Sequence, residues 1–194
     1  MSPPALTFAP ELLLRAQGRG LGMKAALFDV DGVLTDGTLF IGAEGEWMKP
    51  FSVLDGHGLK LLQRGGIEPI VITGRDSAAV RRRVADLGLE RAVFGAADKL
   101  AAAEALWREL GIEWSEVAAI GDDWPDLPLL ARAAFAAAPP NAHAEVRAVV
   151  HHITSARGGR GAAREFCDLL LQANGRYAGL LREHSGSGAT LDAR

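Results

Sequence analysis

Short runs of apolar residues alternate with amphipathic stretches along most of this chain. Buried strands are predicted at residues 24–30, 67–73, 91–94 and 117–120, with shorter candidates at 134–137 and 149–153. Helices are predicted at residues 59–64, 77–87, 99–110, 125–131 and 162–172. Parallel strands need crossover connections, so this alternation predicts an α/β fold with a doubly wound, Rossmann-like parallel sheet and helices on both faces.

Residues 38–51 break this rhythm and read as a β-hairpin flap around a glycine-containing turn, inserted after the first strand. A lone exposed hairpin is marginally stable in water, and its edges invite pairing with another chain. We therefore expect Phe40, Ile41, Trp47 and Phe51 to pack on another subunit. A hairpin folded back onto its own domain is the alternative.

Composition narrows the classes of partner. The chain has 194 residues, of which 48% are hydrophobic, enough for one buried core. A formal net charge of −3 offers no basic field, so neither nucleic acid nor an anionic membrane is an expected partner. The single cysteine, Cys167, excludes an internal disulfide and a cysteine-rich zinc site. No apolar run approaches the roughly 20 residues that span a bilayer, and we expect a cytoplasmic protein.

The pattern divides the chain into three parts. Residues 1–22 are expected to form a flexible or loosely docked N-terminal extension, because their Gly- and Arg-rich end is typical of a linker. Residues 23–177 carry the α/β pattern and form the predicted domain. Residues 178–194 are expected to be a C-terminal tail without a long apolar face.

Acidic residues follow two of the predicted strands. Asp29 and Asp31 end the first strand, and Asp122 and Asp123 follow the strand at 117–120, with Asp126 one turn later. The carboxyl ends of parallel strands meet at one edge of the sheet, where a cation must offset the repulsion between carboxylates. Oxygen ligands favour Mg²⁺ over zinc.

Candidate anion ligands follow the same logic. Thr73 ends the second strand, Gly74 lets a backbone N–H approach an anion closely, and Lys99 brings a point charge to a helix start. Each signal is weak alone, because an Asp after a strand is often a helix cap and such a Lys is usually solvated. The order of the signals along the chain carries the information.

That order is Asp-x-Asp-Gly, Thr-Gly-Arg, Asp-Lys and Gly-Asp-Asp-x-x-x-Asp, which resembles the haloacid dehalogenase phosphatase superfamily. From about Met23 to Tyr177 the chain further resembles the family of 3-deoxy-D-manno-octulosonate 8-phosphate phosphatases, which lack a large cap domain. The residues that carry this second resemblance are Asp31–Gly37, the hairpin, Val53–Lys60, Gly74–Ser77, Arg81–Arg83 and Gly158–Glu165.

The resemblance implies a magnesium-dependent phosphatase that forms an aspartyl phosphate on Asp29, with Asp31 as general acid and then general base. It also implies that Mg²⁺ is held by Asp29, the Asp31 backbone carbonyl and Asp122, with Asp123 and Asp126 as orienting residues. The implied phosphate ligands are Gly32, Thr73, Gly74 and Lys99, and the candidates for the sugar acid are His57, Lys60, Arg75 and Arg83. A small phosphorylated sugar acid as substrate, a role in lipopolysaccharide precursor synthesis and a homotetramer assembled through the hairpin are implied as well.

Three alternatives remain open. Leu54 stands where the family commonly has arginine, so the motifs do not fix the sugar. A phosphatase for another nine-carbon sugar acid, or a phosphatase-like partner of a nucleotidyl-sugar pathway, would carry the same catalytic motifs. A receiver-type signalling module also gathers Asp, Thr and Lys around Mg²⁺, but its acids and its phosphoacceptor lie on different strands, whereas Asp29 and Asp31 share one. Residues 158–161 are either a phosphate loop or a glycine-rich turn before the helix at 162–172.

Overall fold

The computed structural model describes residues 4–18 and 22–185. Its centre is a six-stranded sheet in the order β5-β4-β1-β6-β7-β8, in which every neighbouring pair is parallel. The strands are β1 (Ala25–Phe28), β4 (Glu68–Ile72), β5 (Arg91–Val93), β6 (Val117–Ile120), β7 (Phe135–Ala138) and β8 (His152–Ile153). The predicted parallel α/β sheet is confirmed.

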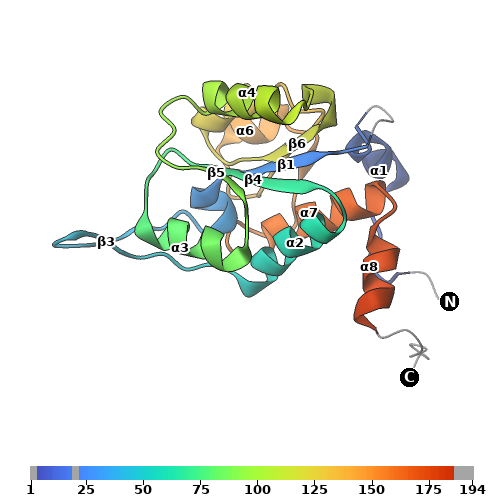
Figure 1. Cartoon of the computed structure of the whole chain (residues 1–194), viewed down its shortest axis with the longest axis horizontal. Helices are drawn as coiled ribbons and strands as arrows, with labels where there is room; N and C mark the ends of the chain where they lie inside the picture. The colour runs from blue at the N-terminus through green and yellow to red at the C-terminus, as the bar shows by residue number, and fades with distance from the viewer. Residues whose placement is uncertain (1–3, 19–21, 186–194) are drawn as a thin grey trace.

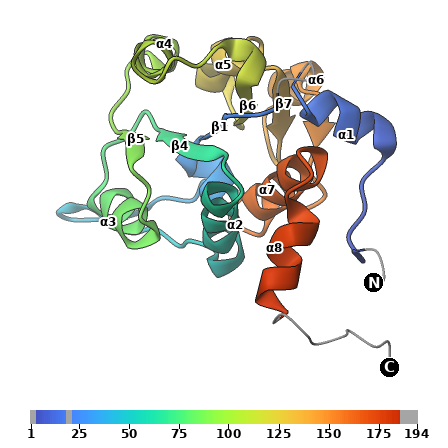
Figure 2. The same ribbon diagram turned by 45° about the vertical axis from the view of Figure 1, so that its right-hand side comes forward.

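Helices cover both faces of this sheet (Figures 1 and 2). One face carries α4 (Lys99–Leu110), α5 (Leu127–Leu130) and α6 (Ala144–Val149); the other carries α2 (Val53–Arg64), α3 (Ala78–Leu87) and α7 (Ala162–Ala173). Each face buries a separate apolar cluster, because side chains alternate across the strands. Among the described residues, no helix has the length and apolar character needed to cross a bilayer.

The chain order makes β1 the switch point of the sheet. After β1 the chain builds β4 and β5 on one side, then crosses to place β6, β7 and β8 on the other. In open parallel sheets the crevice beyond the strand ends at such a switch point is the usual ligand site. This is where Asp29, which follows β1, lies beside the ends of β4 and β6.

The hairpin consists of β2 (Phe40–Gly42) and β3 (Gly45–Met48), and it projects away from the domain (Figure 1). Ile41 is 64% and Trp47 77% exposed, so the hairpin is not folded onto its own domain. Phe51 differs from the prediction, because it is partly buried and packs against the core of its own chain.

Helices also form where the sequence did not predict them. The segment expected to be a flexible extension contains α1 (Pro10–Ala16), in which Ala16 is buried and Leu12 and Leu13 pack against the core. The expected tail contains α8 (Tyr177–His184), which buries Leu180. Within these two segments, residues 1–3, 19–21 and 186–194 lie outside the described residues.

Three predicted boundaries are also corrected. The helix expected at residues 59–64 begins at Val53, because the Ser52 side chain caps it by accepting a hydrogen bond from the Asp55 backbone N–H. The helix expected at 125–131 is divided into the turn η3 (Trp124–Asp126) and α5, with Pro125 in the first turn. Of the expected strand at 149–153, Val149 is the last residue of α6, and only His152 and Ile153 form β8.

Candidate active site

Three strands deliver polar side chains to one edge of the sheet. Asp29 follows β1, Thr73 follows β4, and Asp122 lies two residues beyond β6. The Asp29 backbone N–H still donates to the Ile120 carbonyl at 3.1 Å, and that of Thr73 donates to the Val93 carbonyl at 3.0 Å. Ladder hydrogen bonds therefore fix the backbone beneath the reacting groups.

Lys99 lies at the centre of the buried charges. Its Nζ is 2.6 Å from Oδ1 of Asp29 and 2.7 Å from Oδ1 of Asp126, and all three residues are buried. The other oxygen of Asp126 accepts a hydrogen bond from the Asp122 backbone N–H at 3.0 Å. Asp126 thus orients both the ammonium group and the loop that carries Asp122.

The carboxylates of Asp29, Asp122 and Asp126 offer oxygens that lie within 4.8 Å of one another. Burial, followed by the charge of Asp126, raises the pKa of Asp29 well above its ordinary value and the pKa of Asp122 to about 7. Burial opposes ionisation of Lys99, but Asp29 and Asp126 outweigh it and raise the Lys99 pKa. One ammonium against three acids leaves excess negative charge among oxygen donors, which fits a hard divalent cation such as Mg²⁺.

The loop after Asp29 is an irregular turn, η1 (Val30–Leu34), with Gly32 at a φ of +94°. A Cβ at Gly32 would collide with the Asp122 carboxylate, so only glycine fits there. Thr35 secures the turn: its hydroxyl accepts from the backbone N–H of Gly37 at 3.2 Å and of Gly32 at 3.4 Å, and it donates to the Val30 carbonyl. The Gly32 N–H, predicted to bind phosphate, makes this long hydrogen bond here.

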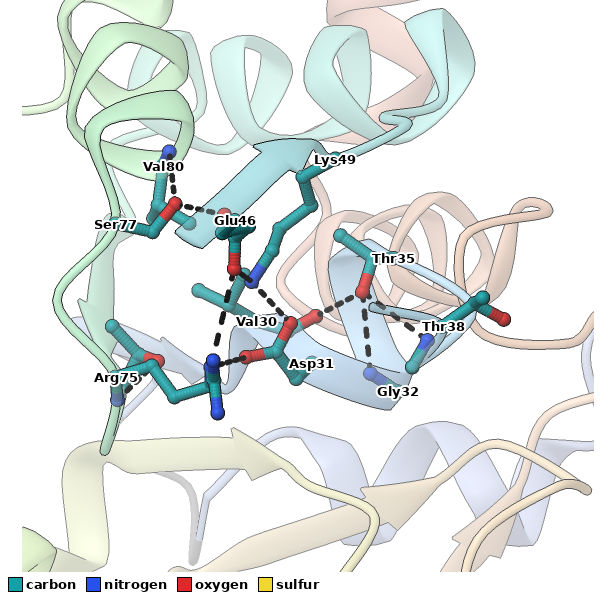
Figure 3. A network of polar contacts seen from close by, with 12 residues as sticks. Val30, Asp31, Gly32, Thr35, Thr38, Glu46, Lys49, Arg75, Ser77 and Val80 are labelled. Carbon is teal, nitrogen blue, oxygen red and sulfur yellow. Dashed lines mark hydrogen bonds and ion pairs between the residues drawn. The ribbon is translucent and has the colours of Figure 1, made fainter. Parts of the chain in front are cut away.

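Asp31 faces a second group of charges (Figure 3). Its Oδ1 is 2.6 Å from Nζ of Lys49, and its Oδ2 is 4.0 Å from Nε of Arg75. Lys49 and Glu46, which are 3.2 Å apart, come from the hairpin and were missed by the sequence reasoning. The available signal was a lysine directly after the apolar pair Trp47-Met48.

The other predicted anion ligands lie near this group. Thr73 is buried, and its hydroxyl accepts from the Arg75 backbone N–H at 3.3 Å. A Cβ at Gly74 would have no contact closer than 3.7 Å, so the space around this residue does not by itself require glycine. Thr73, Gly74 and Arg75 form a short connection between the end of β4 and the start of α3.

The four candidates for sugar-acid binding are spread over several elements. Arg75 lies beside Asp31, whereas the Arg83 guanidinium donates to the Ser52 carbonyl at 3.1 Å. The His57 ring contacts the His184 ring of α8, with centroids 5.6 Å apart. Lys60 is exposed on α2 and has no ion pair within the described part of the chain. Arg75 is therefore the one placed in contact with an acidic group of the site.

The glycines at 158–161 pack against the turn η1, which carries Asp31 and is called the catalytic turn below. A Cβ at Gly158 would collide with the Gly32 carbonyl, and the Gly159 N–H donates to the Val33 carbonyl at 2.8 Å. Asn141, another residue that sequence reasoning missed, joins the two segments. Its side chain accepts a hydrogen bond from the Gly158 N–H at 2.8 Å and donates one to the Gly32 carbonyl at 3.3 Å. This close backbone packing favours the structural interpretation of the glycines over a phosphate loop.

A cavity of about 300 Å³ adjoins this turn, between Asp36, Phe51, Leu54 and Arg160. Its lining combines the charged Arg160 and Asp36 with the apolar Phe51 and Leu54. A larger cavity of about 650 Å³ lies at the opposite edge of the sheet, between residues such as Lys24, Gly66 and Arg176. Neither cavity is lined by a predicted site residue. The smaller one borders the turn that carries Asp31, through Asp36 and through Gly159, whose N–H bonds the Val33 carbonyl.

Comparisons with known proteins agree with this geometry. Residues 94–165 match the family model of haloacid dehalogenase-like hydrolases. The 3-deoxy-D-manno-octulosonate 8-phosphate phosphatase of Haemophilus influenzae is 43% identical over 154 residues, which cover 79% of this chain and 86% of the relative. The Yersinia pestis phosphatase of the same name is 37% identical over 83% of this chain and 86% of its own length.

Solved structures give the same relationship. A crystal structure of the Moraxella catarrhalis phosphatase in complex with magnesium ion, phosphate ion and KDO superimposes with a TM-score of 0.84 at 41% identity, covering 90% of this chain and 98% of the other. The cobalt-bound Haemophilus influenzae phosphatase has a TM-score of 0.79 at 40% identity, covering 84% and 94%.

Proposed function

The chain belongs to the 3-deoxy-D-manno-octulosonate 8-phosphate phosphatase family of haloacid dehalogenase-like hydrolases, and we propose that Asp29 is the nucleophile of its reaction. It is a Mg²⁺-dependent phosphatase that releases phosphate from 3-deoxy-D-manno-octulosonate 8-phosphate. The observation that carries the nucleophile assignment is the buried Asp29 carboxylate, 2.6 Å from Lys99 and beside the acids of the predicted metal site.

The first half of the proposed reaction transfers the phosphoryl group to the enzyme. An oxygen of Asp29 forms a bond to phosphorus while the bond between phosphorus and the sugar oxygen breaks. Asp31 gives its proton to the departing oxygen. Gly32, Thr73, Gly74 and Lys99 bind the phosphoryl oxygens, where preorganised donors stabilise the developing charge.

The second half returns the enzyme to its starting state. Asp31, now ionised, takes a proton from water, and the water oxygen attacks phosphorus as the bond to Asp29 breaks. This double role requires Asp31 to reach both the leaving oxygen and the water. Its position two residues after Asp29, on the same strand end, distinguishes this proposal from a receiver-type module that stores its phosphoryl group.

The metal complements these residues. Asp29, the Asp31 backbone carbonyl and Asp122 would hold Mg²⁺, and Asp123 and Asp126 would orient the ligands. When bound, the ion supplies positive charge that offsets repulsion between the carboxylates and the phosphate. The raised pKa values of Asp29 and Asp122 agree with this assignment, since burial first and the charge of Asp126 second oppose their ionisation, and a bound cation would favour it.

Substrate contacts form a separate part of the proposal. Arg75 is the preferred ligand of the sugar-acid carboxylate, because a guanidinium matches a carboxylate in shape and this one borders the site. His57, Lys60 and Arg83 are the remaining candidates. Leu54, exposed beside the smaller cavity, is the observation that favours testing nine-carbon sugar acids as a second substrate class.

The remaining proposals concern the whole chain. Residues 23–177 form the phosphatase domain, and four copies assemble through the hairpin. The apolar side chains exposed on β2 and β3 support this assembly. The enzyme acts in the cytoplasm on a precursor of lipopolysaccharide.

Phosphate release from the octulosonate phosphate tests the nucleophile. We expect Asp29→Asn to lower kcat by more than about 10³-fold, because the amide that replaces the carboxylate is a much weaker nucleophile. The exposed Asp86, paired with Arg82 at 2.9 Å, supplies the control: Asp86→Asn should leave the rate unchanged. Equal phosphate release by wild type and Asp29→Asn would overturn the assignment. Sugar acid phosphates of nine carbons, assayed in parallel, compare the two substrate classes.

A further inference from the structure

Lys49 is a buried cation that no step of the reaction above uses. Its side chain is 0% exposed, and its Nζ lies 2.6 Å from Asp31 and 3.2 Å from Glu46 (Figure 3). A buried ammonium is costly unless charged partners surround it. Here both partners are carboxylates, and one of them is the proposed acid and base of the reaction.

Both carboxylate oxygens of Glu46 have a polar partner. One of its oxygens accepts a short hydrogen bond from the Ser77 hydroxyl, and that hydroxyl also caps α3 by accepting from the Val80 N–H. The other oxygen receives no well-aligned hydrogen bond in the described part of the chain, so its contact with Lys49 is an ion pair. Two acids, Lys49 and the more distant Arg75 bring the formal charge of this group to zero.

These contacts connect three segments. Ser77, the N-cap of α3, donates a hydrogen bond to Glu46 on β3. Two ion pairs then lead from Glu46 to Lys49, directly after β3, and from Lys49 to Asp31 in the turn η1. The side chain of Asp31 is 22% exposed, so it can face a substrate while Lys49 cannot. Asp31 is therefore the partner through which Lys49 is expected to act on the reaction.

We propose that Lys49 is a positioning residue for catalysis, whose ammonium group, held by Glu46, fixes the carboxylate of Asp31 where it exchanges protons with the leaving oxygen and with water. This inference rests on the proposed role of Asp31. It also gives the base of the hairpin a role in the active site of its own subunit, exerted through Asp31.

The expected effect follows from orientation. Without Lys49 the Asp31 carboxylate keeps its chemical nature but samples other rotamers, and a misplacement of about 1 Å in a catalytic group costs about 10²-fold in rate. Lys49→Met, which keeps the length of the side chain, should therefore lower kcat for the octulosonate phosphate by about 10²-fold and change KM by less than about threefold. Lys49→Arg should recover at least about a tenth of the lost rate, because it restores a cation.

A second substrate separates positioning from general damage. Nitrophenolate leaves without much help from an acid, whereas dephosphorylation still needs Asp31 as base. With p-nitrophenyl phosphate we expect Lys49→Met to release about one nitrophenolate per active site in a burst, followed by slow turnover. A variant that is merely partly unfolded would show a smaller burst and an unchanged rate per remaining site.

The control is Lys24→Met, which removes a lysine paired with Glu116 at 2.7 Å, outside the site. Its kcat and KM should equal those of wild type. If Lys49→Met does not fold, Glu46→Gln decides: it keeps Lys49 but removes the charge that holds it, and should lower kcat by about tenfold without raising KM.

Three results would overturn the inference: an unchanged kcat in Lys49→Met or Glu46→Gln, a loss confined to KM, or an absence of recovery in Lys49→Arg. Failure of the proposed function looks different. If wild type does not hydrolyse the octulosonate phosphate, the burst and turnover of Lys49→Met with p-nitrophenyl phosphate, compared with wild type, still test the role of Lys49. If Asp29→Asn retains that burst, the nucleophile assignment is wrong.

Discussion

The buried charges beneath the catalytic turn depend on one lysine. Burying a carboxylate costs several kcal/mol unless a partner and hydrogen bonds compensate. Lys99 forms ion pairs with both Asp29 and Asp126. Asp126 in turn accepts hydrogen bonds from the backbone N–H groups of Asp122 and Asp123 and so fixes the loop that carries them. Within the described part of the chain Asp122 forms no ion pair with a cation, and burial together with the charge of Asp126 raises its pKa to about 7 despite the nearby Lys99.

This raised pKa predicts how the metal-free protein responds to pH. Folded Asp122 keeps its proton to about pH 7, whereas an unfolded aspartate loses it near pH 4. Between these values the folded state binds more protons, so the free energy of unfolding falls as the pH rises. Thermal unfolding in EDTA should therefore show a lower Tm at about pH 8 than at about pH 5. Each kcal/mol lost from the free energy of unfolding should lower the Tm by about 2–4 °C.

Magnesium should reverse this trend, because it binds the ionised carboxylate. The increase in Tm on adding Mg²⁺ should be larger at about pH 8 than at about pH 5. Asp122→Asn removes the titrating group, so in EDTA its Tm should change less with pH than that of wild type. Identical pH dependence in the two proteins would contradict the assignment of the shift to Asp122.

Residues directly after buried strands were the predictable part of the site. Asp29, Thr73 and Asp122 follow apolar runs, and a parallel sheet brings such positions together whatever the loops do. Lys49 and Asn141 were not predictable in this way. They reach the site because the base of the hairpin lies beside Asp31 and the loop after β7 passes Gly32, and both arrangements depend on tertiary packing.

At the scale of elements, α2 and α7 are joined by one buried carboxylate. Asp55 lies in the first turn of α2 and accepts hydrogen bonds from the Gly161 N–H at 3.1 Å and the Arg164 N–H at 2.8 Å. These donors belong to the N-terminal turn of α7, where backbone N–H groups lack helical partners. Because α7 adjoins the Gly158–Gly159 turn, this cap also supports the catalytic loop.

Removal of the cap should therefore destabilise the fold. Asp55→Ala leaves two backbone N–H groups without their partner in a buried place, which costs about 1–3 kcal/mol. Urea unfolding monitored by circular dichroism measures this loss. Asp86→Ala, which breaks only an exposed pair with Arg82, should remain within about 0.5 kcal/mol of wild type. Equal stability of the two variants would contradict the capping role.

The elements that the sequence predicted best have strong periodicity and clear ends. The helix at Lys99–Leu110 has the predicted bounds, since Asp98 caps its start and Gly111, in the left-handed region, ends it. By contrast, α1 and α8 are short helices whose order comes from contact with the core, through residues such as Leu12, Leu13 and Leu180. Local sequence carries little information about such docking.

At the scale of the whole molecule, the hairpin is the largest departure from a compact shape (Figure 1). Its apolar side chains, Leu39, Phe40, Ile41, Trp47 and Met48, are all more than a third exposed. Its base, in contrast, is anchored by Lys49 and Glu46. A firmly held base below strands with exposed apolar side chains suits a hairpin that binds another copy of the chain.

The proposed tetramer makes this suggestion testable. Burying a large apolar side chain stabilises association by about 1.5–3 kcal/mol, and a charge in its place opposes it. The combined change Ile41→Glu and Trp47→Glu should convert a fourfold assembly into a 20.5 kDa monomer with unchanged circular dichroism, as light scattering after gel filtration will show. Leu14→Glu, at a residue 67% exposed on α1, is the matched control and should leave the mass unchanged. A monomeric wild type at micromolar concentration would refute the tetramer, whereas a tetramer that survives the double change would place its interface away from the hairpin.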